Sequence, residues 1–152
     1  MTRRVLKSGA FVLLLLPVAV SADDTPENIV KYRAAVMSSM AKHMKSTSMV
    51  VGGKVSVPGE LEWHAAALAG AGKNLGSLWP EGSGPGKVES GSLETVWTTP
   101  EEFQQAVKQY QVETRALLEL SKGSDMKASA AQFKKVGATC GGCHKAFRKD
   151  DD

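Results

Sequence analysis

Several patterns that define other protein classes are missing from this sequence. Apolar and polar residues nowhere alternate in the way that predicts a half-buried strand. After the first 22 residues no apolar run approaches the roughly 20 residues that a membrane-spanning helix needs. No internal repeat is visible. These absences argue against a β-sheet fold, a repeat architecture and a membrane-spanning domain after residue 22.

The chain also lacks an excess of charge once its first residues are set apart. It has 19 Lys and Arg and 16 Asp and Glu in all. Three of the positive charges and none of the negative ones lie in residues 1–22, so residues 23–152 carry 16 of each sign. Nucleic acids and anionic membranes require a clustered positive surface. We therefore expect neither of them as a partner.

Residues 1–22 have the layout of a secretory signal peptide. Three basic residues precede an apolar run over 10–20, and the small residues Ser21 and Ala22 come directly before Asp23. We expect cleavage near Ala22, export to the periplasm, and one mature domain over 23–152 without membrane insertion. An uncleaved anchor is the alternative.

Proline and glycine indicate two helices in the first half of the mature chain. Pro26 follows Asp24-Thr25 and suits the first helical position, and Gly52-Gly53 predicts the end of that helix. Between them, apolar residues recur at spacings of three and four. A second helix is predicted over 61–75. Its glycines weaken it, but they allow a close approach to another helix.

Two more helices are predicted in the second half. Residues 78–97, rich in Gly, Pro and Ser and bracketed by Trp79 and Trp97, form a crossover loop. Thr99-Pro100-Glu101-Glu102 predicts a capping box, and the last helix begins near Asp125. Because short turns join the first pair of helices and the last pair, neighbours are antiparallel. The predicted fold is all-α, an antiparallel four-helix bundle.

Both cysteines and one of the three histidines stand together near the C-terminus, as Cys140-Gly141-Gly142-Cys143-His144. C-x-x-C-H is the attachment pattern of c-type haem. Residues three apart share a helix face, so each thiol can add to one vinyl group of the haem. The next residue is rotated by about 100° and can bring its imidazole to the iron. We expect one haem c, held covalently by Cys140 and Cys143, with His144 as iron ligand.

Three other readings of the two cysteines are weaker. A disulfide leaves His144 unexplained. A thioredoxin-like redox motif belongs at the start of a helix beside a βαβ unit, whereas this one comes late in the last helix. A structural zinc site needs four ligands, and only His43 and His64 remain to complete it.

Four stretches resemble the class II cytochromes c, the group of cytochrome c prime and its low-spin relatives. They are VKYRAAVM, LWPEGSGPG, VWTTPEEF and, the most specific, VGATCGGCHKAFRK. The resemblance covers the whole mature chain. It implies an exported haem protein with an antiparallel four-helix fold, in a family whose members are often homodimers.

The resemblance also suggests what lies on the other side of the iron. The stretch Arg33-Ala-Ala-Val-Met37 matches the R-x-x-x-M of the family. Low-spin relatives fill the sixth iron position with a methionine from the first helix, whereas cytochrome c prime proper usually leaves it open. We expect Met37 to ligate iron and Arg33 to contact a haem propionate. Met40 competes as ligand, and core packing is the alternative role for Met37.

Two functions follow. The first is a one-electron carrier, not an enzyme, with iron held by His144 and Met37 and with redox proteins as partners. The alternative is a haem protein with an open distal site that binds nitric oxide or carbon monoxide. A peroxidase-like enzyme is disfavoured, because no candidate acid–base pair is visible for the distal side.

Overall fold

The computed structural model describes residues 24–150, and the expected leader and cleavage site lie outside this range. Four long helices dominate the described part. Two short ones, η1 and α3, lie in the connection between the second and third long helices. The elements are α1 (Pro26–Val51), α2 (Glu60–Gly72), η1 (Leu75–Leu78), α3 (Thr95–Thr98), α4 (Pro100–Ser121) and α5 (Met126–Phe147).

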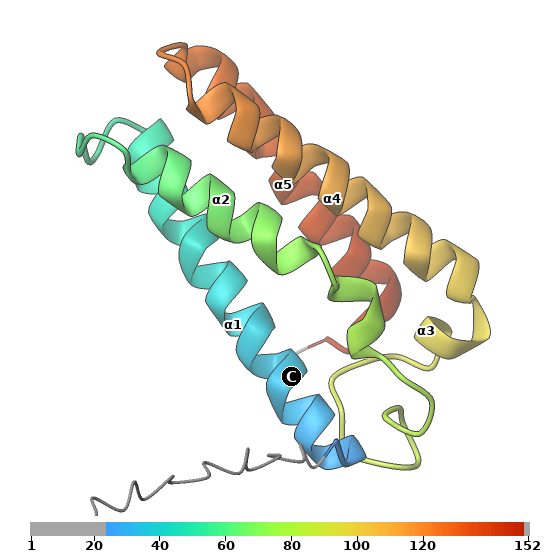
Figure 1. Ribbon diagram of the computed structural model, residues 1–152. Coiled ribbons are helices and arrows are strands. Elements are labelled where there is room, and N and C mark those ends of the chain that lie inside the picture. Colours follow the sequence, from blue (N-terminus) through green and yellow to red (C-terminus); the bar gives the residue numbers. More distant parts are fainter. Residues whose placement is uncertain (1–23, 151–152) are drawn as a thin grey trace, which may run out of the picture.

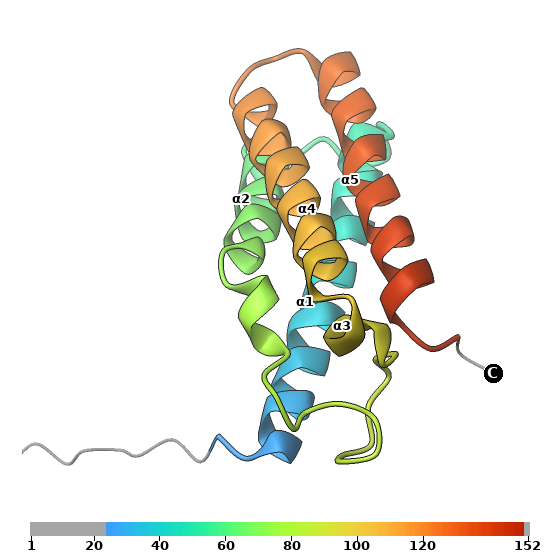
Figure 2. The same ribbon diagram turned by 90° about the vertical axis from the view of Figure 1, so that its right-hand side faces the viewer.

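The long helices run up and down in turn and form an antiparallel bundle (Figures 1 and 2). Around the bundle α1 contacts α2, α2 contacts α4, α4 contacts α5, and α5 returns to α1. The crossover and α3 lie at the end of the bundle where α1 begins and α5 ends (Figure 1). The predicted all-α four-helix fold is confirmed. Among residues 24–150 no helix is long and apolar enough to cross a membrane.

Local caps explain where two of the long helices begin. The hydroxyl of Thr25 accepts a hydrogen bond from the backbone N–H of Asn28 (3.3 Å). The carboxylate of Asp125 accepts one from the N–H of Ala128 (2.8 Å). Each oxygen satisfies an amide of the first turn that has no partner within the helix. Both starts agree with the prediction.

Three details differ from the prediction. The second helix ends at Gly72 and gives way to η1. The crossover contains the helical turn α3, which the loop-like composition did not reveal. The capping box at Thr99 is wrong, because the hydroxyl of Thr99 donates to the carbonyl of Thr95 (2.9 Å) and makes no cap hydrogen bond. Since α3 directly precedes α4, a carbonyl is available there.

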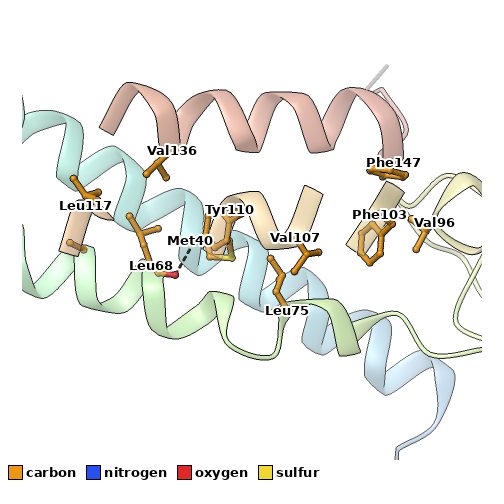
Figure 3. Packing of buried hydrophobic residues seen from close by; sticks show 11 residues of the cluster. Met40, Leu68, Leu75, Val96, Phe103, Val107, Tyr110, Leu117, Val136 and Phe147 are labelled. Carbon is orange, nitrogen blue, oxygen red and sulfur yellow. Dashed lines mark hydrogen bonds between the residues drawn. The ribbon is translucent and has the colours of Figure 1, made fainter. Parts of the chain in front are cut away.

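Buried side chains from all four long helices meet along the bundle axis (Figure 3). Leu68, Leu117 and Val136 are completely buried. Toward the crossover the core becomes aromatic, and the ring of Phe103 makes edge contacts with Trp79 (4.9 Å between centroids) and Phe147 (5.3 Å). These aromatic contacts join the crossover to the C-terminal end of α5.

Backbone hydrogen bonds also fasten the crossover to the end of α5. The N–H of Leu93 donates to the carbonyl of Phe147, and the N–H of Lys149 donates to the carbonyl of Gly91, both at 2.9 Å. Ser92 and Arg148 form an isolated antiparallel bridge. The loop is therefore fixed against the helix that carries the C-x-x-C-H motif.

Candidate haem site

A cavity of about 410 Å³ opens between α1, the crossover, α4 and the end of α5. This volume lies in the range of small-molecule and cofactor sites. Its walls are mainly apolar. The lining residues are Val30, Arg33, Ala34, Met37, Ser38, Ala41, Leu75, Trp79, Ser90, Gly91, Ser92, Val96, Phe103, Val107, Cys143, His144, Phe147 and Arg148.

The end of α5 brings the predicted attachment residues to this cavity. Cys143 and His144 line it, and Cys140 lies one turn earlier. Both sulfur side chains are half-buried and pack against the hydrophobic core. A side chain added at Gly141 or Gly142 would meet no protein atom within 4 Å. Two thiols one helical turn apart, beside an apolar cavity and a histidine, are the donor set that a covalent haem needs.

The other readings of the cysteines find no support in this geometry. No disulfide joins Cys140 and Cys143. Burial raises the pKa of Cys140 and of Cys143, the reverse of what a thiolate-based redox motif requires. Within the described range, no group of three or more His, Cys, Asp or Glu side chains is placed to hold a metal ion.

Met37 and His144 both line the cavity, although they are more than 100 residues apart in the sequence. Met37 is partly buried and packs against the core. Met40 is 8 % exposed and belongs to the core cluster itself, near Tyr110 and Leu68 (Figure 3). It is not among the lining residues. Of the two methionines considered as ligands, Met37 is thus the one that reaches the cavity.

Arg33 also lines the cavity, and its guanidinium is held by neutral oxygens of the crossover. Nη1 donates to the carbonyl of Leu78 (3.0 Å) and the hydroxyl of Ser83 (3.2 Å). Nη2 donates to the carbonyl of Ser83 (3.1 Å) and the hydroxyl of Ser90 (2.8 Å). The cation lies 5.0 Å from the ring centroid of Trp79.

The residue is only 4 % exposed, and burial lowers the pKa of its guanidinium. It is therefore no solvated surface arginine, and its contact with a haem propionate stays a prediction. Sequence reasoning did not identify Ser83 and Ser90. The only indication of their role was the Gly- and Ser-rich loop itself.

The two remaining histidines form a separate pair on α1 and α2. Nδ1 of His43 lies 2.9 Å from Nδ1 of His64, and neither residue lines the cavity. They pack against each other, away from the haem cavity.

Comparison with known protein families gives the same reading as the site. The family model described as Cytochrome C' matches residues 28–148, which is most of the chain. The chain belongs to the cytochrome c prime family. It is 29 % identical to cytochrome c prime of Rhodospirillum rubrum over 99 % of this chain and 100 % of that protein. It is 30 % identical to the one from Pararhodospirillum photometricum, over 82 % of this chain and 99 % of the relative.

A solved cytochrome c prime structure also matches closely. It is the nitric oxide complex of a variant from Alcaligenes xylosoxidans, with a TM-score of 0.74 and 26 % identity over 84 % of this chain and 98 % of that one. The protein is thus a class II c-type cytochrome and carries one haem c, bound covalently through Cys140 and Cys143.

Proposed function

We propose that this cytochrome c prime binds nitric oxide or carbon monoxide at an iron site whose sixth position is open. His144 is the proximal ligand, since it follows Cys143 directly and lines the same cavity. When bound, the haem supplies an iron that coordinates neutral diatomic gases. The protein acts by binding, and turnover of a substrate is not part of the proposal.

The observation that carries the proposal is the apolar wall that α1 contributes to the cavity. Val30, Ala34, Met37 and Ala41 line it, and the polar residues that α1 adds are Ser38 and Arg33, whose guanidinium is already hydrogen-bonded to the crossover. A charged ligand entering such a wall loses hydration without compensation, whereas a neutral diatomic gas loses little. The nitric oxide complex of the Alcaligenes xylosoxidans relative supports the same ligand class. In this proposal Met37 limits the space beside the iron by its bulk and does not bond to it.

The electron carrier is the second candidate. The thioether of Met37 lines the cavity that also contains His144. Ligation by methionine and histidine would raise the reduction potential and leave no position for an added gas. The two hypotheses therefore differ in one bond, between iron and the sulfur of Met37.

Spectroscopy of the purified ferric protein and of Met37→Leu separates the two hypotheses. Leucine keeps the volume and removes the sulfur. If the gas-binding proposal holds, both proteins have high-spin, five-coordinate iron, and the ferrous forms of both bind carbon monoxide. A low-spin parent that Met37→Leu converts to high spin would establish the carrier instead. A low-spin parent that the substitution leaves unchanged would redirect attention to Met40.

Export and assembly complete the proposal. The leader-like residues 1–22 and the covalent haem both favour the periplasm as the site of function. The resemblance to the family favours a homodimer. In the described range the exposed aromatic side chains of Tyr32 (60 %) and Trp63 (58 %) lie on α1 and α2. Tyr32 therefore lies outside the core and does not line the haem cavity.

A further inference from the structure

A second concave surface lies on the other side of Val107 from the haem cavity. It is a groove of about 650 Å³ between one face of α4 and the turn that follows α2. Gln104, Lys108, Gln111 and Arg115 line it from α4, at the three- and four-residue spacing of a single helix face. Lys73, at the end of α2, lies across from them.

The positive charge of this groove has no counterpart in the described part of the chain. Lys73, Lys108 and Arg115 line it, and no acidic residue does. None of the three takes part in an ion pair among residues 24–150. The nearest acid along α4 beyond Arg115 is Glu119, which pairs with Lys122 (2.8 Å). In a mature chain with balanced charge, this groove is a local concentration of positive potential.

Hydrogen bonds fix the floor of the groove. The side-chain amide of Gln111 donates to the carbonyl of Gly72 (2.8 Å), and Nε of Arg115 donates to the carbonyl of Gln111 (3.1 Å). The first bond holds α4 against the end of α2, and the second orients the guanidinium of Arg115 along α4, while Lys73 and Lys108 remain exposed. The cations are therefore displayed on a rigid frame.

The groove also shares a wall with the haem cavity. Val107 is buried (4 % exposed) and lines both. A molecule seated in the groove is thus separated from the haem cavity by one side chain at that point. A positively charged surface close to a redox centre steers negatively charged partners to it.

We propose that this groove is the docking site for the acidic surface of a redox partner protein, which passes one electron to the iron. In that step the partner loses one electron and ferric iron becomes ferrous. Several carboxylates are required, because single ion pairs with exposed lysines contribute little. The inference rests on the haem c of the family and not on whether the sixth iron position is open.

Calorimetry with a synthetic hexaglutamate peptide measures binding without reference to the iron. The mature haem protein should bind the peptide at an ionic strength of about 0.01 M, where the Debye length is about 30 Å. Lys108→Glu should weaken this binding about fivefold or more. Lys54→Glu is the matched control, because Lys54 is an exposed lysine in the α1–α2 turn and the net charge changes equally. Equal effects of the two substitutions would overturn the proposal.

Electron exchange with small ions tests whether the groove is also the point of electron entry. Ferricyanide, an anionic one-electron oxidant, should oxidise the ferrous protein more slowly in Lys108→Glu than in Lys54→Glu. The difference should disappear at high salt. Oxidation by a cationic cobalt complex should not be slowed in Lys108→Glu. If hexaglutamate binds but Lys108→Glu does not slow ferricyanide, the electron-entry role is wrong.

Inorganic phosphate distinguishes a docking surface from a site for one small anion. A docking surface predicts that hexaglutamate slows ferricyanide far more than phosphate of equal total charge. If hexaglutamate and phosphate slow ferricyanide equally, the groove is a site for a small anion and the proposal of a protein partner is wrong. Spin state and carbon monoxide binding, which test the proposed function, do not enter any of these measurements.

Discussion

Arg33 illustrates how one residue organises the site. The family resemblance predicts a contact with a haem propionate, and in the structure its guanidinium donates four hydrogen bonds to neutral oxygens of the crossover. Ser90, which accepts one of them, lines the haem cavity. A residue of α1 thereby fixes the position of a loop whose bonded residues lie 45 to 57 positions further along the chain.

Removing this guanidinium should loosen the crossover. Arg33→Met leaves buried acceptors at Leu78 and Ser83 without donors, so we expect the free energy of unfolding to fall by about 2–4 kcal/mol. Arg33→Lys should lose less, because it keeps a cation but not the planar fork. Urea unfolding followed by circular dichroism measures both. Arg115→Met, at an exposed position, is the control, and an equal loss there would contradict the assignment.

At the scale of elements, glycine decides how closely α2 approaches α4. A Cβ at Gly72 would lie 2.9 Å from the ring of Tyr110, which no ordinary packing allows. Nearby, the hydroxyl of Tyr110 donates to the carbonyl of Leu68 (2.9 Å). The expectation that small residues of the second helix permit close packing is thus correct for Gly72. It fails for Gly70, where a Cβ would meet nothing within 4 Å.

The two glycines should respond in opposite directions to the same substitution. Gly72→Ala should destabilise the protein by about 1–3 kcal/mol, because Tyr110 must move. Gly70→Ala should be neutral or stabilise by up to about 1 kcal/mol, because alanine is the better helix former and has room. Thermal unfolding of both variants under one condition tests this. Equal effects would show that α2 does not pack as described.

The contact between α1 and α2 includes two histidines whose protonation states are coupled. Nδ1 of His43 and Nδ1 of His64 lie 2.9 Å apart. One of these nitrogens must therefore carry a proton and donate the hydrogen bond, and the other must be unprotonated to accept it. Burial lowers the pKa of His64, the charge of His43 lowers it further, and Glu60, with its carboxylate 3.5 Å from Nε2, opposes both. The ring of Trp63 contacts that of His64 at a tilt of 49°, with ring centroids 4.5 Å apart.

Acidification should therefore weaken the α1–α2 contact. Below the ordinary histidine pKa of about 6.5, the unfolded chain binds a proton at His64 that the folded chain resists. The contribution to stability is present above that pH and declines as the pH falls. Urea unfolding at about pH 7.5 and about pH 5.5 should show a larger loss for the parent than for His64→Gln. If the parent and His64→Gln lose stability equally, the histidine pair does not cause the pH dependence.

At the scale of the whole molecule, the haem cavity lies between the first and the last long helix of the bundle. Several of its lining residues belong to α1, the first long helix, whereas Cys143 and His144 belong to α5, the last. A haem tethered to α5 therefore adds contacts between α1 and α5, which meet less extensively than α4 and α5 do.

One mass measurement tests both covalent events expected of this chain. The exported protein should have the mass of residues 23–152 plus one haem. The haem should remain after extraction with acidified acetone, because thioether bonds survive that treatment. In Cys140→Ala/Cys143→Ala the same extraction should remove it. An exported protein that retains Met1, or that releases its haem on extraction, would contradict the expectation.

The sequence by itself determined the four long helices and the attachment chemistry. Helix starts at Thr25 and Asp125 follow from local side-chain caps, and C-x-x-C-H requires only the spacing of residues on one helix. Such features depend on neighbours within a few residues, so a sequence displays them directly. The same holds for the bundle class, which periodicity and short turns indicate.

Only the tertiary structure decided which distant residues share the cavity. It placed Met37 and not Met40 at the cavity, gave Arg33 the hydrogen-bond acceptors Ser83 and Ser90, and turned the hydroxyl of Thr99 toward Thr95. Each outcome depends on atoms brought together from separate segments, or on an unexpected turn such as α3. Local propensity contains no information on such contacts, because packing and the satisfaction of buried polar groups decide them in the folded chain.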